Sequence, residues 1–375
     1  SVACLTLALI ALADAETGKD YGISNWKCDA EVMKKSKTKP TSVHSLRYAD
    51  INIIAALGDS LTAANGAGAP DGDLLGVAIQ YRGLAFGIGG DMSLDEHVTL
   101  TNVLRKFNPD LFGYSIKTGS ASVWDIAHLN AAIPGALSHG LVDQANDLVN
   151  KMKTHSEIDV QSDWKLVHIF IGGNDICHWC KHADGVSAEH YRDNIGAAVQ
   201  ILKDNLPKTV VVLVGMFDLS LLRKIDKEKH SCYVVHEVEC PCDTQLDYSN
   251  DDITAECGKY QTAQEDLMDG RFEADDFSLV IQPFLEEIHD PPSLPNGEPD
   301  LNYFAPDCFH FSQFGHGVVA KSLWNNLVQP VGAKDRYANL TDLTPPLACP
   351  DKACPFLRTS KNSVDCGSYM TPAEN

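Results

Sequence analysis

Short apolar runs alternate with amphipathic segments through the middle of the chain. The runs at 51–57, 166–171, 209–217 and 277–284 are rich in Val, Ile and Phe. Because each run is far shorter than a membrane span, the pattern predicts buried parallel strands.

Apolar residues between these runs follow the spacing of helices. This spacing extends over 141–152 and 191–206, and a further amphipathic helix is predicted for 312–327. A chain that alternates strand and helix in this way predicts a doubly wound α/β sheet.

One domain accounts for the predicted strands and helices. We place it at 45–330, after an N-terminal extension at 16–44 and before a tail at 331–375 that is expected to wrap onto the domain. Residues 218–260 interrupt the pattern with mixed charges and four cysteines, and we interpret them as an insertion pinned by disulfides. The proline-rich stretch at 290–299 predicts a surface loop.

The first fifteen residues have the pattern of a secretory leader. Residues 1–15 form an apolar run that ends in Ala-Asp-Ala, which predicts a signal peptide, truncated because the chain begins at Ser1 with no basic segment. The alternative is a short buried strand or helix. Twelve cysteines and the glycosylation sequon at Asn339 favour an oxidising, extracellular location. Loss of Cys4 with the leader would leave an odd number of cysteines, so at least one is expected to be unpaired.

Composition and charge narrow the classes of partner. The chain has 375 residues, 44% of them hydrophobic, which is ample for a globular core. Its formal net charge of −21 opposes binding to a polyanion. Nucleic acid is therefore excluded as a main partner.

A serine follows the first predicted strand directly. Ser60 lies in Gly58-Asp59-Ser60-Leu61, where a strand, a turn and a helix start would expose its hydroxyl and direct its backbone N–H toward a developing negative charge. The alternative is that Asp59 and Ser60 only cap the helix, because both residue types are favoured there.

An acid and a histidine near the other end of the chain complete a candidate catalytic set. Asp307 precedes His310 by three residues, a spacing that one tight turn can close into a hydrogen bond to Nδ1–H. The other histidines, such as His178, His289 and His316, have no such acid and are interpreted as ordinary core or surface residues. Serine, histidine and aspartate together are the groups that serine-dependent ester hydrolysis requires.

Residues after the second predicted strand offer an oxyanion donor. Asn174 lies in Gly-Gly-Asn-Asp, at the strand end where α/β sheets place ligands, and its side-chain amide can donate to an oxyanion. The alternative is an ordinary turn. Shortly after it, Cys177 and Cys180 form a Cys-x-x-Cys pair for which zinc binding and thiol exchange are alternatives. A local disulfide that fixes the Asn174 loop is the preferred interpretation.

Four sequence blocks occur in an order that resembles one known family. They are residues 58–61, residues 130–136 (NAAIPGA), residues 172–175 and residues 307–310, and together they resemble the GDSL (SGNH) hydrolases. Longer stretches, including GDSLTAANGAGA, YRGLAFGIGGD, FIGGNDIC and FAPDCFHF, are similar to the phospholipase B branch of that family. The resemblance spans roughly residues 45–360.

The resemblance implies a fold and a role for each site residue. The fold is a three-layer α/β/α, flavodoxin-like SGNH hydrolase fold with a parallel central sheet and disulfide-pinned insertions. Ser60 is implied as the nucleophile, His310 as the base and Asp307 as its partner. The implied oxyanion hole consists of the Ser60 N–H, the Gly135 N–H and the Asn174 side chain. Gly119 is an alternative to Gly135. No metal and no cofactor are implied.

The implied function is that of a secreted serine esterase that cleaves acyl esters of phospholipids or lysophospholipids through an acyl-enzyme. Its partners would be this lipid substrate and, transiently, a membrane or micelle surface. One alternative is a carbohydrate or short-chain ester deacetylase on the same fold, and another is a secreted lipid-binding or interaction protein with a dead site. Six apolar residues can line an acyl groove or belong to the core, and the core is favoured for most of them: Leu74, Leu75, Val77, Ile79, Leu84 and Phe86.

Overall fold

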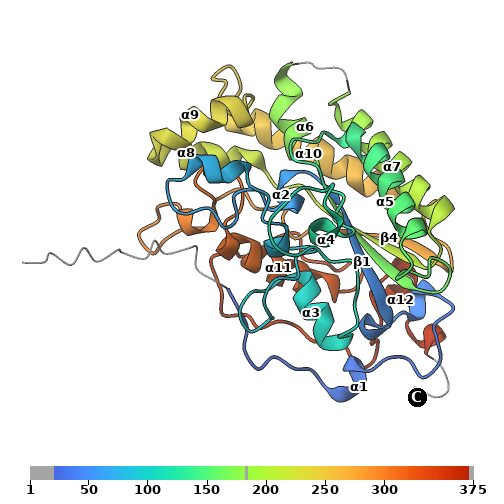
Figure 1. Ribbon diagram of the computed structural model, residues 1–375. Helices are drawn as coiled ribbons and strands as arrows, with labels where there is room; N and C mark the ends of the chain where they lie inside the picture. Colours follow the sequence, from blue (N-terminus) through green and yellow to red (C-terminus); the bar gives the residue numbers. More distant parts are fainter. Residues whose placement is uncertain (1–20, 182–184, 371–375) are drawn as a thin grey trace, which may run out of the picture.

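The computed structural model describes residues 21–181 and 185–370 (Figure 1). The predicted signal peptide at 1–15 lies outside the described residues. Within these ranges no helix has the length and the apolar content that crossing a membrane would require.

A parallel sheet of four strands forms the middle layer. Its strands adjoin in sequence order and all run in one direction, with Gly58 opposite Phe170 and Val214 opposite Gln282. Nearly every strand residue is buried, as continuous apolar runs predict for a parallel sheet covered on both faces. The strands are β1 (Ile51–Gly58), β2 (Trp164–Phe170), β3 (Thr209–Val214) and β4 (Phe277–Gln282).

Helices cover both faces of the sheet and complete a three-layer α/β/α fold, which confirms the predicted fold class. On one face α5 (Leu141–Thr154), α7 (Ala188–Asn205) and α10 (Asn250–Glu265) pack side by side, with α5 against β1 and α7 against β3. On the other face α3 (Leu100–Phe107) contacts α11 (Gln313–Leu327), which also contacts β4. The helices lie where the helical spacing of apolar residues predicted them.

Two of the long helices, α7 and α11, begin at serine side chains that cap them. Ser187 accepts a hydrogen bond from the backbone N–H of His190 at the start of α7, and Ser312 accepts one from Gly315 at the start of α11. Such caps satisfy N–H groups that have no partner within the helix, so they fix where each helix begins.

The segment predicted as an insertion is helical. After a short 3₁₀ turn it contains α8 (Leu222–Glu228), α9 (His230–Glu239) and α10, and α8 and α9 lie at one end of the fold, beyond the sheet (Figure 1). Disulfides pin this segment to the rest of the domain, as expected, through Cys177–Cys240, Cys180–Cys242 and Cys232–Cys308.

The predicted disulfide between Cys177 and Cys180 is therefore wrong. These two cysteines lie in α6 (Gly173–His178) and the 3₁₀ turn that follows it, and both face the Cys240-Pro241-Cys242 segment. A helical backbone holds each cysteine toward this neighbouring segment, whose two cysteines form the bonds. The same disulfides use the sulfur atoms that zinc binding would need. Among the cysteines of the described residues, Cys257 is free and buried.

The C-terminal segment packs along the N-terminal one. Cys28 is bonded to Cys349, and the Leu357 N–H donates to the Leu46 carbonyl at 2.8 Å. The remaining short helices of the fold are α1 (Ala30–Met33), α2 (Ser60–Ala63), α4 (Trp124–Ala127) and α12 (Ser360–Val364).

Candidate active site

The nucleophile turn, residues 58–61, joins the end of β1 to the start of α2. Asp59 caps α2 by accepting a hydrogen bond from the Leu61 N–H at 2.9 Å, and Ser60 is the first helical residue. A Cβ atom at Gly58 would lie 2.5 Å from the Phe170 carbonyl oxygen, so only glycine lets β1 end against β2 here. Burial raises the pKa of Asp59 to about 7.

The acid–base turn, residues 304–311, lies between β4 and α11. The Asp307 carboxylate accepts from the backbone N–H groups of Phe309 and His310 through Oδ1, each at 3.0 Å. Its other oxygen, Oδ2, accepts from His310 Nδ1 at 2.5 Å. Cys308 adopts a left-handed backbone conformation with φ of 64°, which lets the turn close between the acid and the histidine.

The two turns meet in one hydrogen-bonded chain. Because His310 Nδ1–H donates to Asp307, Nε2 is the accepting nitrogen, and it lies 2.8 Å from Ser60 Oγ. All three residues are buried, with Ser60 7% exposed and His310 8% exposed. The structure thus brings together the three residues that the sequence singled out, although Ser60 and His310 are 250 positions apart.

Electrostatics favour a charged pair in this chain. Burial alone lowers the pKa of His310, but the Asp307 carboxylate outweighs it, so the pKa lies above the usual value of a histidine. Burial likewise raises the pKa of Asp307, and the His310 ring outweighs that effect, so the pKa of Asp307 is lowered. Asp307 is therefore suited to stabilise an imidazolium on His310.

Two of the candidate oxyanion donors, Asn174 and Gly135, lie on adjoining segments. Asn174 belongs to α6, which starts just after β2, and its amide donates to the Ala136 carbonyl at 3.0 Å, next to Gly135. The loop of Gly135 in turn runs along the end of β1, since the Ile133 N–H donates to the Gly58 carbonyl at 3.1 Å. Gly135 has a positive φ of 74° and open space around its Cα.

The alternative glycine is engaged elsewhere. The Gly119 N–H donates to the Gln80 carbonyl at 3.0 Å, and the Gly119 carbonyl accepts from Arg82 at 2.9 Å. Because its N–H already has a partner, Gly119 is the weaker candidate for an oxyanion donor.

Sequence reasoning missed Gln144, which holds the nucleophile turn. From α5, the Gln144 side chain accepts from the Gly58 N–H and donates to the Gly58 carbonyl, each at 2.9 Å. The side chain is 4% exposed. A polar residue between Leu141 and Leu148 on the apolar face of a predicted helix was the available signal.

Two further polar side chains that the sequence analysis missed brace the Gly135 loop. Arg82 is fully buried and donates to the carbonyls of Asn130 and Ala132, and its burial lowers the pKa of the guanidinium to about 10. Asp175 accepts from both the N–H and the hydroxyl of Ser138, which ties α6 to this loop. A buried arginine with carbonyl partners gives no recognisable motif in a single sequence.

The six apolar residues that follow the nucleophile turn divide into two groups. Val77, Leu84 and Phe86 are buried, as expected. In contrast, Leu74 and Leu75 are 52% and 87% exposed, and Ile79 is 42% exposed. The expectation of core positions therefore holds for only half of them, and even within the 3₁₀ turn at 74–78 Leu74 and Leu75 are exposed whereas Val77 is buried.

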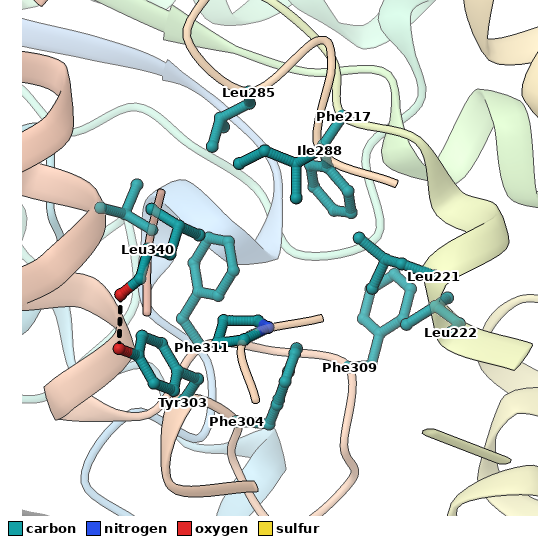
Figure 2. Close-up of a pocket in the computed structure, with 12 residues that line it drawn as sticks. Phe217, Leu221, Leu222, Leu285, Ile288, Tyr303, Phe304, Phe309, Phe311 and Leu340 are labelled. Carbon is teal, nitrogen blue, oxygen red and sulfur yellow. Dashed lines mark hydrogen bonds between the residues drawn. The ribbon is translucent and has the colours of Figure 1, made fainter. Parts of the chain in front are cut away.

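An apolar cavity lies beside the acid–base turn. Phe309 and Phe311, the neighbours of His310 in the sequence, direct their rings toward it (Figure 2), and the Phe309 ring lies 5.1 Å from the His310 ring. The space within it is about 30 Å³, which is enough for one or two water molecules. Other lining residues are Phe217, Leu221, Leu222, Leu285, Ile288, Pro292, Tyr303, Phe304, Val319 and Leu340.

Two clusters in the described chain contain side chains of the kinds that bind metals. One is Asp226, His236 and Asp243, and the other is Glu239, Asp307 and His310. In the first, His236 Nδ1 is 2.7 Å from Asp226, and in the second His310 Nδ1 is held by Asp307. In each cluster the histidine Nδ1 already faces a carboxylate of the protein, so neither cluster is assigned as a metal centre.

A hydrogen-bonded chain of serine, histidine and aspartate is an arrangement that serine hydrolases on several folds share. The family match places this chain among the carboxylic ester hydrolases. The chain belongs to the family described as GDSL-like lipase/acylhydrolase, which matches residues 54–323.

Its relatives include membrane-associated phospholipase B1 of three mammals. Identity to the Homo sapiens protein is 42% over 350 residues, covering 91% of this chain and 24% of that protein. The Mus musculus protein is 40% identical, with 92% and 24% covered, and the Rattus norvegicus protein is 41% identical, with 89% and 23% covered. The chain thus spans about a quarter of the length of these curated relatives.

Proposed function

We propose that this protein hydrolyses acyl ester bonds of phospholipids or lysophospholipids, with Ser60 as nucleophile. The observation that carries the proposal is the chain of hydrogen bonds from Ser60 Oγ to His310 Nε2 at 2.8 Å and from His310 Nδ1 to Asp307 at 2.5 Å. This arrangement lies at the carboxyl end of a parallel strand, where α/β folds bind their ligands.

The reaction begins when Ser60 Oγ attacks the acyl carbonyl and its proton passes to His310 Nε2. Asp307 stabilises the imidazolium that forms. The negative charge on the carbonyl oxygen of the tetrahedral intermediate is held by the N–H groups of Ser60 and Gly135 and by the Asn174 amide. Collapse of the intermediate transfers the proton from His310 to the leaving alcohol and leaves an acyl-enzyme on Ser60.

Water completes the cycle. His310 takes a proton from a water molecule, which attacks the acyl-enzyme carbonyl, and the same three donors stabilise the second oxyanion. Return of the proton to Ser60 Oγ releases the fatty acid. No step in this sequence needs a metal or a cofactor.

A lipid substrate is supported by the relatives and by the apolar surroundings of the site. The similar mammalian proteins are named phospholipase B1. Phe309 and Phe311 lie beside His310, and the apolar cavity that they line can take part of an acyl chain once its side chains move apart. Exposed Leu74 and Leu75, in the loop that follows the nucleophile turn, provide apolar contacts for a membrane or micelle surface.

Secretion and glycosylation belong to the same proposal. Five disulfides within the described residues support an oxidising compartment. Asn339 is exposed and lies in a turn in which its side-chain oxygen accepts from the Thr341 N–H, so it is accessible as a glycan acceptor. Mass spectrometry of the protein from a secreting cell, before and after glycosidase treatment, tests both points.

Short-chain ester hydrolysis is the second candidate. The small volume of the apolar cavity, about 30 Å³, favours it, because a long acyl chain does not fit there without displacement of Phe309 or its neighbours.

One set of assays distinguishes these candidates. Labelling with a fluorophosphonate, followed by peptide mapping, is expected to place the adduct on Ser60. Hydrolysis of diacyl, lysoacyl and acetyl esters is then compared at equal enzyme concentration, and we expect the long-chain phospholipid esters to be preferred. Labelling of another serine, or cleavage of acetyl esters alone, would overturn the phospholipase assignment.

A further inference from the structure

Helix α9 directs one face toward the acid–base turn. Cys232 and His236 are four residues apart, so their side chains lie on the same side of the helix. Cys232 forms the disulfide with Cys308, and His236 Nε2 lies 3.1 Å from the Asp307 carbonyl oxygen. The insertion therefore contacts the backbone that carries the acid of the triad.

Both ring nitrogens of His236 are engaged. Nδ1 lies 2.7 Å from a carboxylate oxygen of Asp226, on α8, and Nε2 faces the Asp307 carbonyl. Because a carbonyl oxygen can only accept, Nε2 must carry a hydrogen, and the Asp226 carboxylate beside Nδ1 favours a second proton on the ring. Burial lowers the pKa of His236, but Asp226 outweighs this, so the pKa is raised. A ring held at both ends has a fixed orientation.

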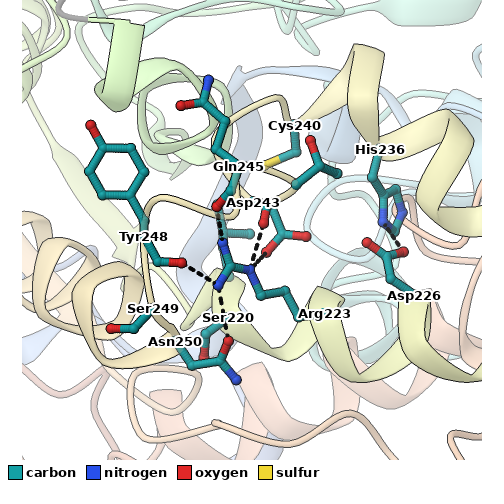
Figure 3. A network of polar contacts seen from close by, with 12 residues as sticks. Ser220, Arg223, Asp226, His236, Cys240, Asp243, Gln245, Tyr248, Ser249 and Asn250 are labelled. Atoms are coloured by element: carbon teal, nitrogen blue, oxygen red, sulfur yellow. Dashed lines mark hydrogen bonds and ion pairs between the residues drawn. The ribbon is translucent and has the colours of Figure 1, made fainter.

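A polar network fixes the segment that follows α9 (Figure 3). Arg223 donates to the backbone carbonyls of Asp243, Gln245 and Tyr248 at 2.6, 2.8 and 2.7 Å, and Asp243 lies beside Asp226. The disulfides of Cys240 and Cys242 join the same segment to α6. The helix that carries His236 is thus continuous with a segment that disulfides join to the rest of the domain.

We propose that His236, held by Asp226, is a positioning residue that orients Asp307 and, through it, His310. The proposal rests on the serine esterase function proposed above. The Asp307 carboxylate is fixed within its own turn by two backbone N–H groups. The turn is joined to α9 at two adjacent residues, by the Cys232–Cys308 disulfide and by the hydrogen bond from His236 to the Asp307 carbonyl. Without the hydrogen bond the turn keeps its disulfide at Cys308 but loses the contact at Asp307 itself, so the peptide after Asp307 can tilt and the carboxylate holds His310 Nδ1–H less well in line with Ser60.

The test compares His236→Gln and Asp226→Asn with a matched control, His44→Gln. His44 is also a buried histidine, but its ring binds Thr359 Oγ1 at 2.8 Å, away from the site. For His236→Gln and Asp226→Asn we expect kcat to fall about 10- to 100-fold, with KM within about twofold of wild type. The rate constant for fluorophosphonate labelling of folded protein should fall in parallel. His44→Gln should melt at a lower temperature and keep its kcat.

A spectroscopic signal separates positioning from general destabilisation. The Nδ1 proton shared by His310 and Asp307 resonates far downfield in proton NMR, and in His236→Gln this resonance should shift or broaden while the remaining spectrum stays that of a folded protein. Should His236→Gln fail to fold, Asp226→Asn carries the same test. Wild-type labelling rates and an unchanged downfield proton in both variants would overturn the proposal, as would an equal loss of kcat in His44→Gln. Absence of Ser60 labelling in the wild type would instead refute the proposed esterase function itself.

Discussion

The nucleophile turn and the acid–base turn meet at one hydrogen bond, yet they are supported in different ways. Ser60 lies between a strand of the sheet and a helix, and its neighbour Gly58 is bound by Gln144 from a helix that packs on the same strand. His310 lies in a turn outside the sheet, and its neighbours are bound from α9 by Cys232 and His236. One turn is part of the regular fold, and the other is held by long-range crosslinks.

The two kinds of support should affect different properties, one the stability of the fold and the other the catalytic rate. A side chain that binds a turn within the sheet, such as Gln144, is packed in the core. Its removal should therefore mainly lower the free energy of unfolding. A side chain that binds a turn outside the sheet, such as His236, can lose its hydrogen bond while the core stays folded. Its removal should therefore mainly misplace a catalytic group. The following substitutions test the comparison on each side.

The largest effect is expected from the nucleophile itself. Ser60→Ala should reduce kcat by a factor on the order of 10⁶ and abolish fluorophosphonate labelling, because no other group at the site can form the acyl-enzyme. The melting temperature should be unchanged, since Asp59, not the Ser60 hydroxyl, caps α2. Steady-state kinetics and differential scanning calorimetry on the same preparation check both expectations. Residual turnover near the wild-type value would show that the nucleophile lies elsewhere.

On the acid–base side, Asp307→Asn should lower kcat by about 10⁴-fold and change the pH profile. The base works only when His310 is neutral, and Asp307 raises its pKa, so wild-type kcat/KM should rise with pH through a pKa above the usual ~6.5. With the carboxylate gone, the pKa of His310 loses the main interaction that raises it, while burial and the weaker effects of Glu239 and Asp59 remain, so the rising limb should move to lower pH. Profiles of kcat/KM from pH 5 to pH 9 measure the shift. An unmoved limb together with an unchanged rate would exclude Asp307 as the orienting acid.

The sequence predicted what is local and missed what joins distant segments. Periodicity and spacing indicated the elements that depend on neighbouring residues. These are the strand before Ser60, the turn from Asp307 to His310 and the helices at 141–152 and 312–327. The disulfide between Cys177 and Cys240 depends on where a distant insertion packs, and no local rule contains that information. Apolar character likewise does not show that Leu75 lies at the surface, because the exposure of a side chain depends on which distant segments pack beside it.

The oxyanion side should give an intermediate effect. Asn174→Ala removes an amide that can bind the tetrahedral oxyanion more tightly than the ground-state ester, so kcat should fall about 10²- to 10³-fold with little change in KM. The same amide donates to the Ala136 carbonyl, so thermal unfolding must be followed as well. Retained Ser60 labelling and a nearly unchanged melting temperature would support the donor role. A loss of kcat that only tracks unfolding would make Asn174 a turn residue.

The smallest effect on rate is expected from Gln144, and the fold supplies a matched control. Gln264, on α10, binds the end of β3 in the same manner, accepting from the Met216 N–H at 3.2 Å and donating to the Val214 carbonyl at 3.1 Å. Both amides are buried, so Gln144→Ala and Gln264→Ala should each destabilise the fold by about 1–3 kcal/mol, because each leaves a buried N–H without its partner. Chemical denaturation measures this loss.

The two glutamines should differ only in the rate of the folded enzyme. Gly58 is the first residue of the nucleophile turn, so Gln144→Ala should lower kcat by about tenfold or less. Gln264 binds the end of β3 instead, so Gln264→Ala should leave kcat unchanged. Assays at a temperature well below both melting transitions isolate this difference. If kcat of Gln144→Ala fell a hundredfold or more, the nucleophile turn would depend on one side chain. This is the kind of dependence that we expect of the acid–base turn on His236. The comparison between a sheet-supported turn and a crosslinked one would then fail, because both halves of the site would rest on the same kind of support.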